Sequence, residues 1–191
     1  NKSELPTYIL AWTTTPWTIP SNMAISMHPR YNYTFFHYKG AYYVVAQDLL
    51  ESFLSDVEWD ENDIHVIATC KGEDLELLET NHPLVNRKSP IILGEHVTLD
   101  AGTGSVHTAP GHGLEDYEVG VKNGIEVFYP VGENGCYTEE AGKYADCGVK
   151  DANPEITHDL CHNVALLKEG TIDHRVGLCW RCKTPIIYIA T

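Results

Sequence analysis

The chain has 191 residues, of which 43% are hydrophobic and 21% charged, a balance typical of an ordinary globular domain. Its longest apolar runs cover only a few residues, so the sequence predicts no membrane-spanning segment, and it begins with no secretory signal. The net charge is −14, from 27 acidic and 13 basic residues. That charge argues against an independent nucleic-acid binder, because phosphate contacts require lysine and arginine.

Two further features predict whether the chain is part of a longer polypeptide and in which cellular compartment it occurs. It begins with Asn1 rather than methionine and stops inside the strand-like run 185–191, which predicts a piece cut from a longer polypeptide. Its six cysteines are a modest number for this length. A reduced, intracellular and cytoplasmic protein is the simplest interpretation.

Most of the chain has the composition of β-strands. Runs rich in β-branched and aromatic residues predict strands at 7–12, 23–27, 31–38, 41–46, 64–70, 90–94 and 104–109. Lys39 and Gly40 separate two of these runs and predict a tight hairpin.

Helices are fewer, and the sequence predicts them at 47–54, 113–122 and 154–168. The last is the clearest, with Asn153 as its N-cap and Gly170 shortly after its end. Four apolar residues recur at helical spacing and predict one buried face: Ile156, Leu160, Val164 and Leu167. Many short strands with a few peripheral helices predict a mainly β fold, a small β-barrel with helical decoration.

The stretch AWTTTPWTIPSN, residues 11–22, contains a row of three hydroxyl side chains. Pro16 restrains Thr15 to an extended conformation, so Thr13 and Thr15 are expected on one side and Thr14 on the other. Hydroxyls both donate and accept hydrogen bonds, which suits a sugar hydroxyl or an attacking water. Threonine is also simply a good strand former, so this stretch alone leaves both interpretations open.

A second unusual stretch is DAGTGSVHTAPGHGLEDY, residues 100–117. Gly102 and Gly104 bracket a turn at which a ligand can approach the backbone closely. His107 lies near the end of a predicted strand, and Asp116 lies in the first turn of the next helix, where the dipole favours a carboxylate. The intervening loop reverses the chain, so the two side chains can face one cleft. The alternatives are an ordinary strand histidine and an acid that only decorates the helix dipole.

Other chemistries find less support in the sequence. His107, His112 and Asp116 are residue types that bind zinc, but their spacing matches no common metalloenzyme pattern. The chain has no activated cysteine context, no G-x-S-x-G motif and no P-loop. Cys179 and Cys182 form a single C-x-x-C pair, which is either half of a zinc knuckle or two structural thiols.

Together, residues 11–22 and 102–120 resemble the two signature peptides of the editing domain that is inserted into the catalytic core of isoleucyl-tRNA synthetases. The tail, residues 174–191, is similar to the stretch in which that family's chain returns to the synthetic domain. The resemblance extends from about residue 8 to the C-terminus. Valyl and leucyl relatives carry an arginine where this chain has Thr15, which favours the isoleucyl branch.

The resemblance implies a small distorted β-barrel of the valyl/isoleucyl/leucyl-tRNA synthetase editing-domain type. Residues 1–178 would form the editing domain, and 179–191 the return segment. It also implies an aminoacyl-tRNA ester hydrolase that removes valine from tRNA(Ile), and valyl-adenylate as a second substrate. Such a second sieve is needed because isoleucine and valine differ by one methylene, worth only about 0.8 kcal/mol of burial.

The resemblance also assigns roles to residues. Asp116 would pair with the α-ammonium group of the amino acid, and His107 would wall the pocket against the longer side chain. The catalytic set is Thr13, Thr14, Thr15, His107 and Asp116, with the threonines binding the ribose hydroxyl and water. The substrate-binding set is Trp17, Asn22, Gly102, Gly104, Thr108 and His112.

The implied partners follow from the same resemblance. They are the 3′-terminal adenosine of tRNA(Ile) carrying valine and the rest of an ATP-binding synthetase used in protein biosynthesis. The fragment itself is expected to be monomeric, with no membrane contact. Editing would need no cofactor and no metal, while Cys179 and Cys182 would contribute to a structural zinc site in the parent enzyme. The alternative function is a non-catalytic β-barrel that binds the tRNA end or a protein.

Overall fold

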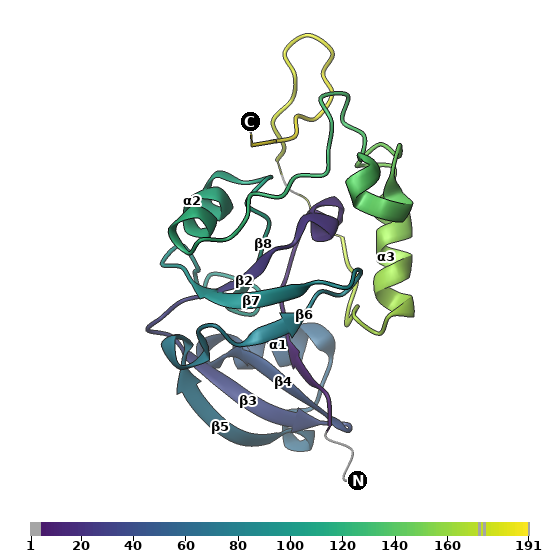
Figure 1. Ribbon diagram of the computed structural model, residues 1–191. Helices are drawn as coiled ribbons and strands as arrows, with labels where there is room; N and C mark the ends of the chain where they lie inside the picture. The colour runs from purple at the N-terminus through teal and green to yellow at the C-terminus, as the bar shows by residue number, and fades with distance from the viewer. Residues whose placement is uncertain (1–4, 172, 174, 191) are drawn as a thin grey trace. The chain divides into compact units, whose positions relative to one another are not determined.

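The computed structural model describes residues 5–171, 173 and 175–190, and Figure 1 shows the course of the chain. These residues belong to two compact units, each assembled from separate stretches of sequence. The first unit is drawn from Asn1–Thr13, Ala24–His82 and Arg87–Thr108, and the second from Thr14–Met23, Pro83–Asn86 and Ala109–Thr191. The expected boundary at residue 178 stays a prediction. The outermost residues of the two chain ends, 1–4 and 191, and position 174 of the tail lie outside the described residues.

The first unit contains a mixed sheet in the order β1-β4-β3-β5 (Figure 1). Its strands are β1 (Thr7–Ile9), β3 (Asn32–Tyr38), β4 (Ala41–Ala46) and β5 (His65–Lys71). β1 runs parallel to β4, while β3 is antiparallel to both β4 and β5. The tight hairpin between β3 and β4 is confirmed, because Lys39 and Gly40 both have positive φ, as a two-residue turn of this kind requires.

A second mixed sheet of the same unit has the order β6-β7-β2-β8. Its strands are β2 (Ala24–Met27), β6 (Glu79–Asn81), β7 (Lys88–Leu93) and β8 (Ser105–Thr108). β2 pairs in parallel with β7 and antiparallel with β8. The mainly β fold with helices is confirmed. Within the described residues, however, the strands form two open sheets, so the expected barrel is not closed.

One hydrophobic core joins both sheets of the first unit to helix α1 (Leu50–Val57). Tyr33, Phe36 and Tyr38 of β3 are all buried in this core, and the ring of Phe36 contacts that of Phe53 of α1. Each fully buried large apolar side chain contributes about 1.5–3 kcal/mol relative to an exposed one. This core supports the sheet on which two of the predicted site residues, His107 and Thr108, lie.

The second unit consists of short helices and irregular chain around its own core. Its helices are η1 (Pro16–Ser21), α2 (Leu114–Lys122), η5 (Glu139–Tyr144) and α3 (Asn153–His162). Trp17 of η1 packs in a cluster with Tyr137, Tyr144, Ile156 and Leu160. Within the described part of the chain, none of the helices combines the length and apolar character that crossing a bilayer requires.

Helix α3 ends earlier than its sequence pattern predicts. Ile156 and Leu160 are buried as expected, but Val164 is 75% exposed and Leu167 42% exposed, so the predicted continuation to 168 is wrong. Val164 has a φ of 56°, its N–H bonds to the carbonyl of Cys161, and the N–H of Ala165 bonds to the carbonyl of Leu160. These two bonds are the Schellman pattern that terminates a helix.

The threonine row also differs from its prediction. β1 ends at Ile9, so Thr13–Thr15 lie outside the strand and Thr14 forms a bend. Thr15 has a φ of −127° and a ψ of 73°, so the extended conformation expected before a proline is not formed, and Pro16 then opens the 3-10 helix η1. The expected alternation of three hydroxyls along a strand is therefore wrong.

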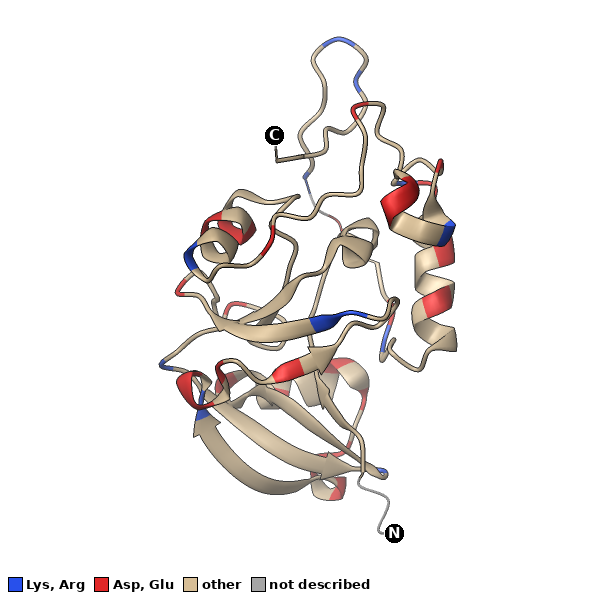
Figure 2. Cartoon of the chain, in the orientation of Figure 1, with Lys and Arg blue, Asp and Glu red and all other residues tan. Residues whose placement is uncertain are grey.

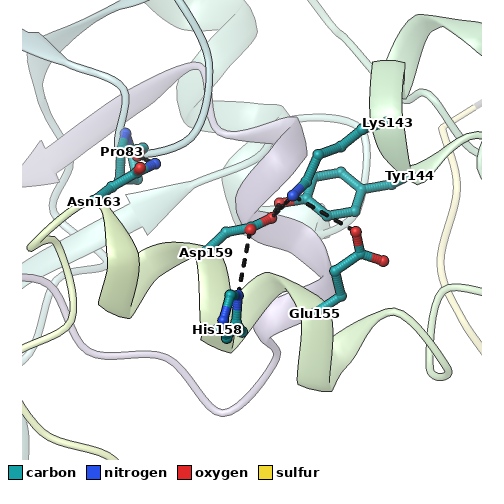
Figure 3. Close-up of polar contacts among 7 residues, drawn as sticks. All are labelled: Pro83, Lys143, Tyr144, Glu155, His158, Asp159 and Asn163. Atoms are coloured by element: carbon teal, nitrogen blue, oxygen red, sulfur yellow. Dashed lines mark hydrogen bonds and ion pairs between the residues drawn. The ribbon is translucent and has the colours of Figure 1, made fainter.

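A polar cluster fastens α3 to η5 (Figure 3). Asp159 accepts a hydrogen bond of 2.5 Å from the hydroxyl of Tyr144, and its other close partner is the ammonium of Lys143. Lys143 also lies 3.5 Å from Glu155. These contacts hold the pKa of Asp159 below its usual range, with the bond from Lys143 as the largest cause. At the other end of α3, Asn163 donates to the carbonyl of Pro83.

Replacing Asp159 tests the contribution of this cluster to stability. We expect Asp159→Ala to lower the free energy of unfolding by about 1–3 kcal/mol, because the hydroxyl of the buried Tyr144 loses its acceptor. Asp159→Asn should cost less, because the amide oxygen can still accept that bond. Urea unfolding at pH 7 measures both variants, and equal losses would contradict the role given to Tyr144.

Candidate functional site

The predicted site residues are divided between the two units, and the division runs through both signature peptides. The first unit holds Thr13, Gly102, Gly104, His107 and Thr108. The second holds Thr14, Thr15, Trp17, Asn22, His112 and Asp116. Inside each unit, part of the first peptide contacts part of the second, as the following contacts show.

In the first unit, the turn at 102–104 lies against the segment that leads into the threonine row. The hydroxyl of Thr103 donates to the carbonyl of Leu10, and the carbonyl of Thr103 accepts from the amide of Ala46 at 2.8 Å. Gly102 has a φ of 83°, and a Cβ placed there would lie 3.3 Å from the Cβ of Trp12. Glycine at 102 thus allows both the turn and the close approach of the two peptides.

Gly104 has even less space for a side chain than Gly102. Its φ is 74°, and a Cβ there would lie only 2.3 Å from the Cβ of Ala46. The carbonyl of Gly104 accepts a 2.6 Å hydrogen bond from the hydroxyl of Tyr33, which itself accepts from the amide of His28. Burial raises the pKa of Tyr33 to about 12, so the hydroxyl keeps its proton and remains a donor at neutral pH.

His107 and Thr108 follow on β8, paired with Ile25 and Ala24 of β2. Their side chains lie on opposite faces, because successive residues of a strand alternate. His107 is half-buried, whereas Thr108 is fully buried with its hydroxyl 2.6 Å from that of Ser26. The role of Thr108 in substrate binding stays a prediction, and its hydroxyl already has a partner within the sheet.

In the second unit, the end of the threonine row forms the start of η1. The carbonyl of Thr15 accepts both the amide and the hydroxyl of Thr18, at 3.0 and 2.9 Å. Thr14 and Thr15 are half-buried, while Trp17 and Asn22 are buried. These two bonds close a turn that fixes the backbone of Thr15 at the start of η1.

His112 connects the second peptide to this turn. Its Nε2 lies 3.0 Å from the hydroxyl oxygen of Ser21, its Nδ1 lies 3.0 Å from the carbonyl oxygen of Tyr188, and its ring packs edge-on against Trp17. Burial lowers the pKa of His112, and the hydrogen bond to Tyr188 opposes this effect only in part. A neutral imidazole is thus part of the second unit's core at neutral pH.

Asp116 lies in the first turn of α2 and is half-buried. One of its carboxylate oxygens accepts a 2.9 Å hydrogen bond from the amide of Ala109, the residue that directly follows β8. The helix N-terminus adds a favourable field for the negative charge. The carboxylate is therefore held in place by the backbone of Ala109, and in its ionised form it has the charge needed to bind a cation.

The C-x-x-C pair lies on a turn closed by a bridge between Leu178 and Pro185. Cys182 lies 2.8 Å from the hydroxyl of Thr184, and hydrogen bonding from Thr184 lowers the pKa of Cys182 to about 7. A thiol that ionises near neutral pH suits a zinc ligand. Elsewhere in the described residues, no group of three or more His, Cys, Asp or Glu is placed to hold a metal. The zinc half-site stays a prediction.

Two residues of the site have no signal in the sequence that singles them out. Ser21 lies inside the first signature peptide, but only the fold places its hydroxyl on His112. Tyr33 is 71 positions away from Gly104 and reads as an ordinary strand aromatic. Both were missed because they act on other residues of the chain.

The arrangement of the chain is that of known synthetase editing domains. Similar folds include the crystal structure of GlLeuRS-CP1, with a TM-score of 0.67 over 90% of this chain and 88% of that one, at 18% identity. The P. falciparum cytosolic leucyl-tRNA synthetase editing domain has a TM-score of 0.53 over 82% of this chain and 67% of that one, at 15% identity. The chain thus has an aminoacyl-tRNA synthetase editing-domain fold.

Sequence comparison shows which synthetases the chain is similar to. It is 50% identical to the isoleucine--tRNA ligase of Methanothermobacter thermautotrophicus, over 97% of this chain and 18% of that protein. The isoleucine--tRNA ligase of Archaeoglobus fulgidus is also 50% identical, over 100% of this chain and 19% of that protein. No protein-family model matches the chain. Along essentially its whole length the chain is thus similar to isoleucine--tRNA ligases, and it spans about a fifth of the length of these relatives.

Two of the positive-φ glycines, Gly40 and Gly104, provide a matched test of the turn. Nothing lies within 4 Å of a Cβ at Gly40, so Gly40→Ala should cost only the left-handed strain of about 1–2 kcal/mol. Gly104→Ala should cost about 1–3 kcal/mol more, because the new Cβ overlaps that of Ala46. Denaturant unfolding of both variants measures the difference, and equal losses would argue against the close approach at Gly104.

The buried histidines predict a pH dependence of stability. Burial lowers the pKa of both His28 and His112 in the folded chain, so their stabilising effect is complete above the unfolded pKa of about 6.5. As the pH falls below that value the unfolded chain takes up protons first, and the folded state loses stability. Urea midpoints at pH 7.5 and 5.5 should show this loss. The loss should be smaller in His112→Gln than in the exposed-histidine variant His158→Gln, and equal slopes would contradict it.

Proposed function

We propose that the chain is the editing domain of an isoleucine–tRNA ligase and hydrolyses the ester of valine misattached to tRNA(Ile). The observation that carries the proposal is the match to isoleucine--tRNA ligases along essentially the whole chain, joined to an editing-domain fold. The placement of both signature peptides supports it, since 10–12 contacts the 102–104 turn and Ser21 contacts His112.

The proposed reaction is the attack of water on the ester carbonyl. The oxygen of water bonds to the carbonyl carbon, the bond to the ribose oxygen breaks, and that oxygen takes up a proton to restore the terminal hydroxyl of the tRNA. Valine leaves as the free amino acid. An ester is already activated, so a positioned water and the neighbouring ribose hydroxyl supply much of the rate through proximity. No covalent intermediate, cofactor or metal is part of the proposal.

Asp116 and the threonine row have roles in this step. The carboxylate of Asp116 binds the α-ammonium group of the amino acid through charge-assisted hydrogen bonds. The hydroxyls of Thr13, Thr14 and Thr15 bind the ribose hydroxyl and the attacking water. Polar groups that face the developing oxyanion stabilise the tetrahedral intermediate.

Selection against isoleucine is assigned to shape. His107 is half-buried on β8, and its imidazole limits the length of the side chain that can enter. Trp17 and Asn22 act from buried positions, which suits residues that set the geometry of a site. Valyl-adenylate is proposed as a second substrate, since it carries the same amino acid with the same free ammonium group.

The net charge is consistent with a chain that contacts only the end of the tRNA. Acidic residues are spread along the chain and basic ones are sparse (Figure 2). The chain therefore needs to contact only the 3′-terminal adenosine, while the rest of a cytoplasmic, ATP-binding synthetase holds the tRNA body. Taken alone, it should be a monomer that binds tRNA weakly, and a tight, salt-sensitive complex would count against this view.

The second candidate is a non-catalytic module that binds the tRNA end or a protein. The joint presence of the threonine row with His107 and Asp116 favours hydrolysis, because plain binding does not need that set. Hydrolysis assays separate the two functions directly.

The test compares hydrolysis of valyl-tRNA(Ile) and isoleucyl-tRNA(Ile) by the 191-residue chain at high concentration and by the complete polypeptide that carries it. We expect faster cleavage of the valyl ester and a loss of about tenfold to a hundredfold in Asp116→Ala, the range for a hydrogen bond to a charged group. Glu115→Ala, on the exposed side of the same helical turn, is the control and should keep full activity. Unchanged activity of Asp116→Ala in the complete polypeptide would refute the proposed site.

A further inference from the structure

The imidazole of His112 is held in one tautomer by two protein partners. The carbonyl oxygen of Tyr188, 3.0 Å from Nδ1, can only accept a hydrogen bond, so Nδ1 carries the proton. In a neutral ring Nε2 is then an acceptor, and the hydroxyl of Ser21 donates to it at 3.0 Å. Both ring nitrogens are therefore engaged inside the chain, where the side chain is 9% exposed.

A continuous set of contacts leads from His112 to the threonine row. Ser21 is the last residue of η1, and Thr15 is its N-cap. Within η1 the carbonyl of Thr15 accepts two bonds from Thr18, and Trp17 packs edge-on against the imidazole with ring centroids 5.0 Å apart. The carbonyl of Trp17 also accepts the hydroxyl of the buried Tyr137. These contacts fix the orientation of η1 at both ends.

The segment that contains Tyr188 is itself tied to the same loop. The amide of Ala190 donates to the carbonyl of Gly111 at 2.9 Å. Ile187 and Ile189 pack against the hydrophobic cluster around Trp17, while the side chain of Tyr188 between them is 67% exposed. Three stretches distant in sequence, 16–21, 111–112 and 187–190, therefore meet at His112.

We propose that His112 is a positioning residue for ester hydrolysis, which holds η1 so that Thr14 and Thr15 are presented in one fixed direction. The inference rests on the proposed hydrolytic function and gives His112 no contact with the reacting atoms. It revises the expectation that His112 binds substrate. A small displacement of η1 would move the hydroxyls that place the water, and misplacement by about 1 Å can cost about a hundredfold in rate.

The experiment measures kcat and KM for valyl-tRNA(Ile) hydrolysis by the complete polypeptide. The variants are His112→Phe, His112→Gln and Ser21→Ala, with His158→Gln on the exposed face of α3 as the matched control. We expect His112→Phe to lower kcat by about tenfold to a hundredfold with KM little changed. His112→Gln should recover part of the loss, because its amide can donate to Tyr188 and accept from Ser21. Ser21→Ala, the smallest change, should lower kcat in the same way even if the phenylalanine variant folds poorly.

A double substitution distinguishes positioning from general support of the fold. If His112 acts through the threonine row, His112→Phe should have little further effect in a Thr15→Ala background. Independent, multiplicative losses in the double variant would show a merely structural role and overturn the proposal. So would full kcat in both His112→Phe and Ser21→Ala.

Failure of the proposed function gives a different result. In that case the unsubstituted polypeptide releases no valine, Asp116→Ala changes nothing, and the role of His112 is refuted together with the function. If Asp116→Ala lowers hydrolysis as expected while the His112 and Ser21 variants keep full kcat, only the positioning role is refuted.

Discussion

The close approach of the turn at 102–104 to the end of β4 is the constraint on which the first unit's part of the site depends. Gly104 leaves no room for a Cβ beside Ala46, and the buried hydroxyl of Tyr33 holds its carbonyl. Because β8 begins at the next residue, this turn determines where the strand pairs with β2. The half-buried position of His107 follows from that register, and a one-residue shift would reverse the faces of His107 and Thr108.

The second unit positions its part of the site in a different way. It contains little regular structure, so its part of the site depends on side chains that satisfy backbone groups across long sequence distances. Asp116 caps the amide of Ala109, and His112 joins Ser21 to the carbonyl of Tyr188. Buried polar groups of this kind are costly unless every partner is present, which makes the arrangement specific.

The sequence allowed prediction of the elements whose signals are local. The hairpin at Lys39 and Gly40, the strands β3 and β4 and the start of α2 follow from composition and turn residues. The end of α3 could not be predicted in this way. Apolar residues continue at helical spacing through Val164, whereas the backbone has left the helix by that residue. The threonine row was expected to be extended because Pro16 restrains Thr15, whereas Thr14 forms a bend and Thr15 precedes the 3-10 helix that begins at Pro16.

The same distinction holds for the site. The signature peptides allowed candidate substrate-binding residues to be predicted, because their combinations of residues are unusual. Ser21 and Tyr33 could not be found in this way, because their importance arises from contacts over 91 and 71 residues, which only the fold reveals. A residue that positions other residues is therefore harder to recognise in a sequence than a residue that binds a ligand.

The interleaving of the two units has a consequence for biosynthesis. The first unit uses residues only up to Thr108, whereas the second includes 14–23, near the start of the chain, together with 109–190. During translation Pro16 and Trp17 emerge before the residues that pack against them, which follow more than a hundred residues later. Trp17 therefore lacks its apolar partners until the residues from Val131 to Ile189 leave the ribosome, and exposed apolar surface of this kind makes a nascent chain prone to aggregation.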